Sequence, residues 1–152
     1  PVQEDAIMAI RTHQSISGFV ASEPQLSHTD RGDARLYMKI GIEHYRKEPD
    51  NSFTQLETTF HDLIAYRGAA EQGVERLAKG DNIIADGRVR EYSYERNGQR
   101  YDGEEFIATR IGHDLARTRY EVDRSGRTVG REAIPFTSPQ HSAPSSAAAL
   151  GM

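Results

Sequence analysis

Hydrophobic and polar residues alternate along much of this chain, a period typical of strands with one buried face. Residues 36–42 give the clearest case, and their apolar set is Leu36, Met38, Ile40 and Ile42. β-Branched, aromatic and alternating content predicts further strands over residues 15–21, 57–66, 82–96 and 99–111, with a bend expected at Gly87. The pattern therefore predicts a protein built mostly from strands.

One segment breaks this pattern and predicts a helix over residues 68–79. Val74 and Leu77 lie three apart in an Ala-rich, charged stretch, and Gly80 follows as a helix stop. Asn97-Gly98 predicts a tight hairpin, because both central residues of a type I′ turn need positive φ. Three strands, a helix and two strands is the element order of an OB-fold. We expect an all-β fold with one short helix: a five-stranded OB-fold barrel with the helix between strands 3 and 4.

The alternation also selects a core. We expect the apolar set of residues 36–42 to fill the barrel with Val20, Leu63, Ile83, Val89 and Ile107. Residues 25–34 and 46–52 hold the turn-forming and polar residues of loops, and Arg31-Gly32-Asp33 is expected to be a turn with flanking charges.

The most informative stretch for function is residues 88–96. Because side chains two apart share a strand face, one face carries Arg88, Arg90, Tyr92, Tyr94 and Arg96. Phe60, Ile64 and Tyr66 share a face in the same way. A binding site for single-stranded nucleic acid uses this combination, because the bases stack on aromatic rings while arginine binds phosphate or stacks on a base. The alternative is that these rings are ordinary strand formers in a half-buried sheet, most simply for Tyr92 and Phe60.

Composition limits the other possibilities. With 152 residues and 36% hydrophobic content, the chain suits one modest domain and a tail. We expect an N-terminal extension over residues 1–11, the OB-fold domain over 12–115 and a largely disordered tail over 116–152, where Pro, Ser and Ala dominate. The absence of cysteine excludes disulfides and thiolate metal sites and allows a cytoplasmic location. The net charge is −4, so any binding of nucleic acid must depend on local placement of charge.

A resemblance follows from motifs in a fixed order over residues 12–115. They are Gly18, Glu23-Pro24, the run from Thr59 to Gly68, Lys79-Gly80-Asp81, the run from Gly87 to Arg90, and the run from Asn97 to Tyr101. In this order the chain resembles bacterial single-stranded DNA-binding proteins (SSBs). The resemblance implies an OB-fold that coats exposed single strands in DNA replication, repair and recombination, as a cytoplasmic, nucleoid-associated homotetramer.

The resemblance also points to site residues. The base-stacking aromatics of the family match Phe60, Tyr66 and Tyr94, and a further one falls near Tyr45. Together with the basic residues, the predicted DNA-binding set is Lys39, Tyr45, Phe60, Tyr66, Arg88, Arg90, Tyr94 and Arg96.

The chain departs from the family in two ways. Members typically use tryptophan at several stacking positions, and this chain has none. Members also end in an acidic tip that docks replication and repair proteins, whereas residues 149–152 are not acidic and Ile134-Pro135-Phe136 is only a faint echo of that tip. Both departures favour an alternative, an accessory OB-fold protein that acts mainly by oligomerisation or protein interaction and binds DNA weakly.

No catalytic site is predicted. The six histidines show no spacing for a helical metal site, and Glu104 and Glu105 point to opposite faces of a strand. We expect no enzyme activity, no cofactor, no metal and no membrane partner.

Overall fold

The computed structural model describes residues 9–126. The chain divides into two compact units, residues 1–119 and 120–152, and the architecture below is that of the first unit. The elements are β1 (Gln14–Val20), β2 (Gln25–His28), β3 (Ala34–Ile42), β4 (Tyr45–Lys47), β5 (Phe53–Gln55), β6 (Thr59–Tyr66), α2 (Arg67–Arg76), β7 (Asn82–Arg96), β8 (Gln99–His113) and a short 3₁₀ turn, η1 (Leu115–Arg117). Most of the predicted N-terminal extension and of the predicted tail, Ile134-Pro135-Phe136 included, lies outside the described residues.

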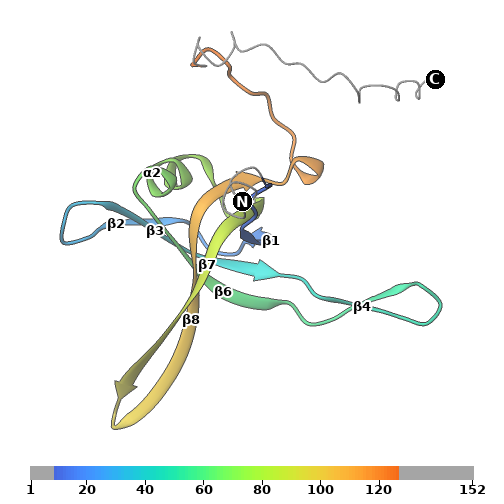
Figure 1. Ribbon diagram of the computed structural model, residues 1–152, viewed down its shortest axis with the longest axis horizontal. Coiled ribbons are helices and arrows are strands. Elements are labelled where there is room, and N and C mark those ends of the chain that lie inside the picture. Colours follow the sequence, from blue (N-terminus) through green and yellow to red (C-terminus); the bar gives the residue numbers. More distant parts are fainter. Residues whose placement is uncertain (1–8, 127–152) are drawn as a thin grey trace. The chain divides into compact units, whose positions relative to one another are not determined.

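Six strands form one sheet in the order β1-β7-β8-β6-β3-β2, which closes on itself because β1 also pairs with β3 (Figure 1). The closing pairs are Phe19 with Gly41 and Val20 with Ile40. At this seam a Cβ on Gly18 would lie 2.3 Å from the carbonyl oxygen of Gly41, so the closure requires a glycine. Strands β6 and β8 run parallel, and the other neighbours are antiparallel. This closed barrel of β1, β3, β6, β7 and β8 confirms the predicted fold class.

The barrel is filled largely as predicted. Its largest buried side chains are Val20, Leu36, Met38, Ile40, Leu63 and Ile83, with Phe106 beside them, and Ile42 packs partly buried against this set. Val89 is a wrong prediction, since half of it is exposed. The β1–β7 pairing ends at Gly87, so β7 leaves the barrel wall before Val89. Ile107 is also outside the core, because it pairs with Arg88 and Ile64 on the other face of the sheet.

The helix follows β6, the third of the predicted strands, as expected. The strand β6 is sixth and not third in the chain because three short strands were not predicted: β2 lies in the predicted loop 25–34, and β4 and β5 lie at the two ends of the predicted loop 46–52. The helix ends at Arg76, not Lys79, and Gly80 (φ 99°) belongs to the turn that follows, where the amide of Asp81 donates to the carbonyl oxygen of Ala78. The helix packs against β3 and β6, with Ala70 fully buried.

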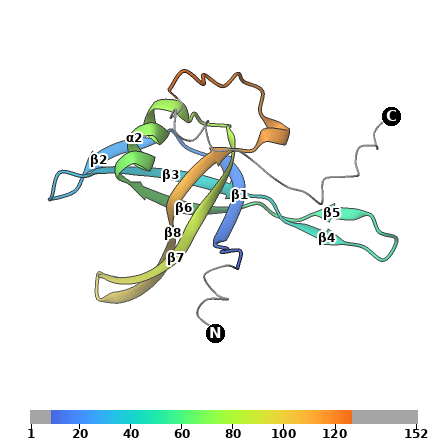
Figure 2. The same ribbon diagram turned by 45° about the horizontal axis from the view of Figure 1, so that its top comes forward.

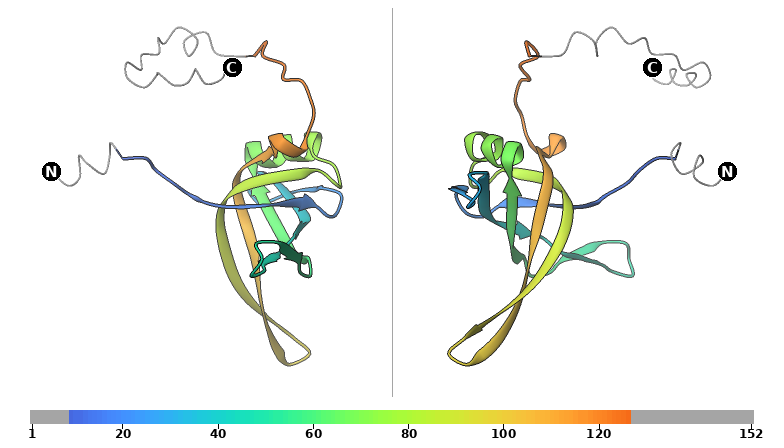
Figure 3. Two further views of the ribbon diagram at one scale, coloured as in Figure 1. Left: turned by 90° about the vertical axis from the view of Figure 1, so that its right-hand side faces the viewer. Right: turned by 60° about the vertical axis from the view of Figure 1, so that its left-hand side comes forward.

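Two hairpins extend from the barrel. The longer one is formed by β7 and β8 (Figure 3). The register shifts at Gly87, where β7 leaves the wall, while β8 stays paired with β6 as far as Glu105. The turn of this hairpin is the predicted one, with φ of 52° at Asn97 and 79° at Gly98. The shorter hairpin, β4–β5, projects away from the sheet (Figure 2). Within residues 9–126, no helix has the length and apolar content to cross a bilayer.

Candidate nucleic-acid interface

The strand register places the predicted residues of β7 on one continuous sheet face. Directly paired residues share a face, and the pairing runs from β7 through β8 and β6 to β3. We call this surface the outer face. It comprises Arg88, Arg90, Tyr92, Tyr94 and Arg96 of β7; Gln99, Tyr101, Gly103, Glu105 and Ile107 of β8; Phe60, Asp62, Ile64 and Tyr66 of β6; and Arg35, Tyr37, Lys39 and Gly41 of β3. The shared faces predicted for residues 88–96 and for residues 60–66 are therefore confirmed.

Three tyrosines cluster on the outer face of the long hairpin. Tyr94 stacks on Tyr101 with ring centroids 5.5 Å apart, and Tyr92 lies 6.2 Å from Tyr94. Tyr94 is 48% exposed. The Tyr92 ring lies over Gly103, where a Cβ would come within 2.7 Å of it, so part of Tyr92 does pack, as the alternative interpretation proposed. The cluster presents flat, accessible rings.

Sequence reasoning missed Tyr101, although the signal was present. A two-residue turn at Asn97-Gly98 fixes the register of the hairpin and pairs Tyr94 with Tyr101 directly. Any face that includes Tyr94 therefore includes Tyr101.

Phe60 and Tyr66 lie at the two ends of the outer-face row on β6. Phe60 is 56% exposed and makes an edge contact with Phe19, with ring centroids 6.4 Å apart. Tyr66 is 36% exposed, at the junction of β6 and α2. Between them Ile64 is buried although it belongs to the outer face and not to the barrel core. Both rings are therefore accessible from the outer face.

Tyr45 lies on a different surface, the β4–β5 hairpin. It pairs with Gln55, and Lys47 pairs with Phe53 on the same side of the hairpin. The exposed Phe53 was not predicted as a site residue. Only the pairing of β4 with β5 shows that Phe53 shares a side with Tyr45 and Lys47, and neither strand was predicted.

A row of charges crosses the middle of the outer face. Arg90, Glu105, Asp62 and Lys39 are paired in register on β7, β8, β6 and β3. The Arg90 guanidinium donates through Nε and Nη2 to Glu105, which is only 8% exposed, and the Lys39 ammonium lies 2.8 Å from Asp62 Oδ1. Both cations, which were predicted as DNA-binding residues, are therefore bound to carboxylates.

Hydrogen bonding within this row shifts the ionisation of its members. Burial opposes the charged form of Asp62, but hydrogen bonds from Lys39 and Tyr37 outweigh burial and hold the pKa of its carboxyl below the usual value. The hydrogen bond to Asp62 raises the pKa of Lys39. Burial, followed by the hydrogen bond to the same carboxylate, raises the pKa of Tyr37. The row is a mutually stabilised ionic network.

Arg88 and Arg96 differ from Arg90 and Lys39. Both are exposed, and neither forms an ion pair with any side chain in residues 9–126. Arg88 pairs with Ile107 where the hairpin leaves the barrel, and Arg96 lies beside the turn. The four basic residues predicted on the outer face thus divide into a compensated pair, Lys39 and Arg90, and an uncompensated pair, Arg88 and Arg96.

Known proteins share the fold and part of the sequence of this chain. The model of the single-strand binding protein family matches residues 12–114, which span the barrel and both hairpins. The chain belongs to this family.

Individual relatives agree with the family match. The chain is 28% identical over 127 residues to single-stranded DNA-binding protein 1 of Streptomyces coelicolor, covering 84% of this chain and 81% of the relative. It is 30% identical over 128 residues to a single-stranded DNA-binding protein of Paenarthrobacter aurescens, covering 83% and 75% respectively. The crystal structure of a small single-stranded DNA-binding protein from Streptomyces coelicolor superposes with a TM-score of 0.60 at 25% identity, over 72% of this chain and all of that one.

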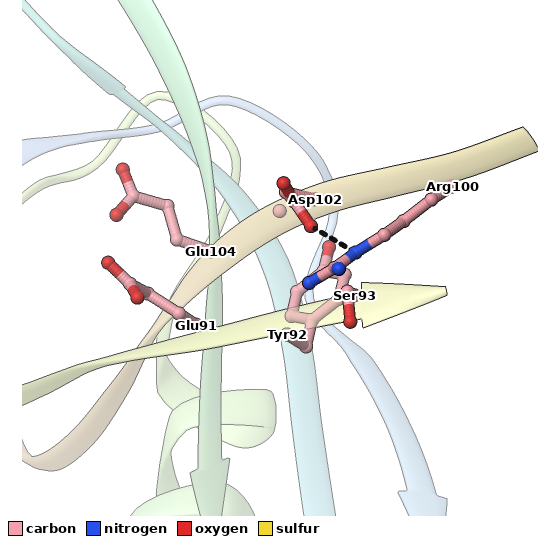
Figure 4. Close-up of a pocket in the computed structure, with 7 residues that line it drawn as sticks. Glu91, Tyr92, Ser93, Arg100, Asp102 and Glu104 are labelled. Atoms are coloured by element: carbon pink, nitrogen blue, oxygen red, sulfur yellow. Dashed lines mark ion pairs between the residues drawn. The ribbon is translucent and has the colours of Figure 1, made fainter. Parts of the chain in front are cut away.

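The opposite face of the long hairpin of this single-strand binding protein has the reverse charge. A cavity of about 620 Å³ opens there, lined by Glu91, Ser93, Arg100, Asp102 and Glu104 of that face and by Tyr92 and Gly103. Glu91 and Glu104 are paired and project side by side, while Arg100 is joined to Asp102 at 3.3 Å (Figure 4). The hairpin therefore separates its charges, with tyrosines and arginines on one face and mainly carboxylates on the other. Polyanion binding is favoured on the outer face alone.

Proposed function

We propose that this single-strand binding protein binds single-stranded DNA without sequence preference through its outer face, by stacking bases on Phe60, Tyr66 and Tyr94 and by contacting phosphates through Arg88 and Arg96. The observation that carries the proposal is the continuity of that face across four strands, with exposed rings and two unpaired arginines on the same side. Every base has a π-face, so such a surface accepts any sequence. Tyr45 extends the interface onto the β4–β5 hairpin.

The lack of tryptophan leaves this mechanism intact. Phenylalanine and tyrosine also present flat rings, and stacking one base on an aromatic ring contributes about 1–3 kcal/mol. The Tyr94–Tyr101 stack already has a near-parallel geometry, with 24° between the rings. A base that adds to this stack meets a surface whose orientation is fixed before DNA arrives.

Arg90 and Lys39 take a secondary part in this proposal. Each is compensated by a carboxylate, so neither adds net positive charge to the face. A phosphate gains less from a cation that must first give up its partner than from Arg88 or Arg96. Arg90 and Lys39 mainly hold the outer face in shape.

The relatives' names, single-stranded DNA-binding protein, support the wider role. We infer that the chain coats and protects exposed strands during replication, repair or recombination, in the cytoplasm near the nucleoid, as a homotetramer. It acts by binding and without catalysis.

A second function has one observation in its favour. Two of the four basic residues predicted on the outer face are occupied by carboxylates, which favours an accessory protein that oligomerises or binds proteins and has weak DNA affinity. The two functions differ in their measured affinity for single strands.

Titration with oligo(dT) and with a matched duplex, each at two salt concentrations, tests the proposal. We expect strong preference for the single strand, and an affinity that falls with salt by up to about 0.7 in log–log slope for each phosphate contact. Equal, weak binding to both probes would overturn the proposal and support the accessory role.

A further inference from the structure

Beside Tyr66 the outer face deepens into a cavity of about 630 Å³. Small-molecule sites span roughly 300–1,000 Å³, so the cavity is large enough for a nucleotide. Its lining includes Thr29, Arg31 and Asp33 of the β2–β3 turn, Tyr66 and Arg67 at the β6–α2 junction, and Ile107 of β8. The sequence analysis treated Arg31 as an ordinary turn residue.

The walls of the cavity carry complementary chemistry. Tyr66 supplies an exposed ring, and Ile107 supplies an apolar floor next to Arg88 on the neighbouring strand. Arg31 and Arg67 line the cavity, and Arg35 is paired with Tyr66 across β3 and β6. The lining itself holds two arginines and two aspartates, Asp30 and Asp33. Arg35 and Arg88 add positive charge on the strands beside it, in a chain whose net charge is −4.

Arg67 adopts an unusual backbone conformation. Its φ is 59°, in the left-handed region that glycine adopts readily and arginine adopts at a cost. Strained positions of this kind cluster at active sites and ligand sites, where the surrounding structure holds them in place. Here the conformation belongs to a residue whose side chain lines the cavity next to the Tyr66 ring.

The ion pair of Arg67 does not prevent its side chain from binding a phosphate. Its Nε lies 3.5 Å from Asp33 Oδ2, and the Arg67 side chain is 75% exposed. An exposed pair at this distance contributes little, so a phosphate can replace the carboxylate. The turn itself is held by the backbone, because the amide of Thr29 donates to Asp33 and the amide of Gly32 donates to Thr29.

We propose that one nucleotide of the bound strand occupies this cavity, with its base on Tyr66, its sugar against Ile107 and its phosphate between Arg31 and Arg67. The β2–β3 turn thereby becomes part of the DNA-binding surface. The proposal rests on the outer-face interface and adds to it a specific phosphate site.

Two variants and one matched control test the site. Arg31→Ala removes a guanidinium from an exposed turn. Arg67→Gly removes the other and also relieves the positive φ, so its thermal stability should not fall. Arg100→Ala is the control, since it removes the same charge from a side chain that is 71% exposed on the opposite face of the hairpin. All are titrated with oligo(dT) at two salt concentrations, beside Tyr94→Ala.

We expect each cavity variant to bind oligo(dT) about three- to tenfold more weakly and to lose up to about 0.7 of the salt slope, while Arg100→Ala stays within about twofold of the parent. If both cavity variants bind like the parent, the phosphate site is wrong. In that case Tyr94→Ala decides whether the outer face still binds DNA. Weaker binding of oligo(dT) by Tyr94→Ala would support the outer-face interface without the phosphate site, and unchanged binding would contradict both.

Discussion

Asp62 and Glu105 are neighbours on β6 and β8, and each holds a cation on the outer face. Without those partners, two adjacent carboxylates would repel DNA at the centre of the surface proposed to bind it. The sequence places Lys39 and Arg90 in register with them on the flanking strands. The network thus neutralises the acids more than it attracts phosphate.

The depressed pKa of Asp62 makes part of the fold's stability depend on pH. The carboxyl has a reference pKa of 3.8 and a lower pKa in the folded protein, so its contribution is complete above about pH 4 and is lost as the pH falls through the folded value. Asp62→Asn should lower the free energy of unfolding by about 1 kcal/mol at pH 7, and the deficit should shrink below pH 4. Denaturant unfolding of the parent and the variant between pH 7 and about pH 3 measures this difference in free energy.

Asp102→Asn is the control for that series, because Asp102 is largely exposed and pairs only with Arg100. It should stay close to the parent at every pH. A deficit for Asp62→Asn that persists unchanged at low pH would show that the carboxylate charge is not what stabilises the row.

The stacking rings are the other residue-scale feature, and they permit a direct test. Tyr66→Ala and Tyr94→Ala should each weaken binding to oligo(dT) by about 1–3 kcal/mol. Tyr66→Phe and Tyr94→Phe keep the ring and should bind nearly as the parent does. Isothermal titration calorimetry measures the binding free energy of the four variants. If the alanine variants bind oligo(dT) as tightly as the parent does, these two positions do not belong to the interface.

At the scale of elements, β7 and β8 each contribute to two parts of the fold. One part of each strand belongs to the barrel wall and the other forms the tyrosine-bearing hairpin. On β7 the register shift between Asp86 and Gly87 marks the boundary, whereas β8 stays in the wall as far as Glu105. At the register shift the strands approach so closely that a Cβ on Gly87 would lie 1.9 Å from the carbonyl oxygen of Ile107. Glycine is therefore a packing requirement where the hairpin begins.

Gly87→Ala should destabilise the fold by about 1–3 kcal/mol, because the methyl group meets backbone that cannot move aside without disturbing the β7–β8 pairing. Gly112→Ala offers the matched control, since nothing lies within 4 Å of its Cβ position and its φ is not positive. Thermal or denaturant unfolding compares the two variants. Equal stability would mean that the strands separate easily at the register shift.

The elements also show what the sequence could and could not predict. The alternation over residues 36–42 and the Asn97-Gly98 turn were sufficient to place β3 and the long hairpin. The four exposed residues of β2 show no apolar alternation, and β2 is a strand because it pairs with β3. The ion pairs of Lys39 and Arg90 depend on register between strands distant in sequence, which no local pattern contains.

At the scale of the whole molecule, part of the barrel edge remains available. β1 pairs with β3 only at Phe19 and Val20. Along Gln14–Gly18 it pairs with β7 on one side and has no neighbour on the other among residues 9–126. Free strand edges pair readily with another strand. This edge suits contact between copies of the chain.

The proposed homotetramer predicts a mass in solution about four times the 17.0 kDa of the chain. Light scattering or native mass spectrometry measures this mass. A single-chain mass for the parent protein would contradict the tetramer.

The tyrosine cluster has an optical consequence. The chain has seven tyrosines and no tryptophan, so no indole is present to accept their excitation energy or mask their emission. Three of the seven rings lie together on the long hairpin. Bases that stack there should quench the intrinsic fluorescence of the unlabelled protein and so report occupancy of that hairpin.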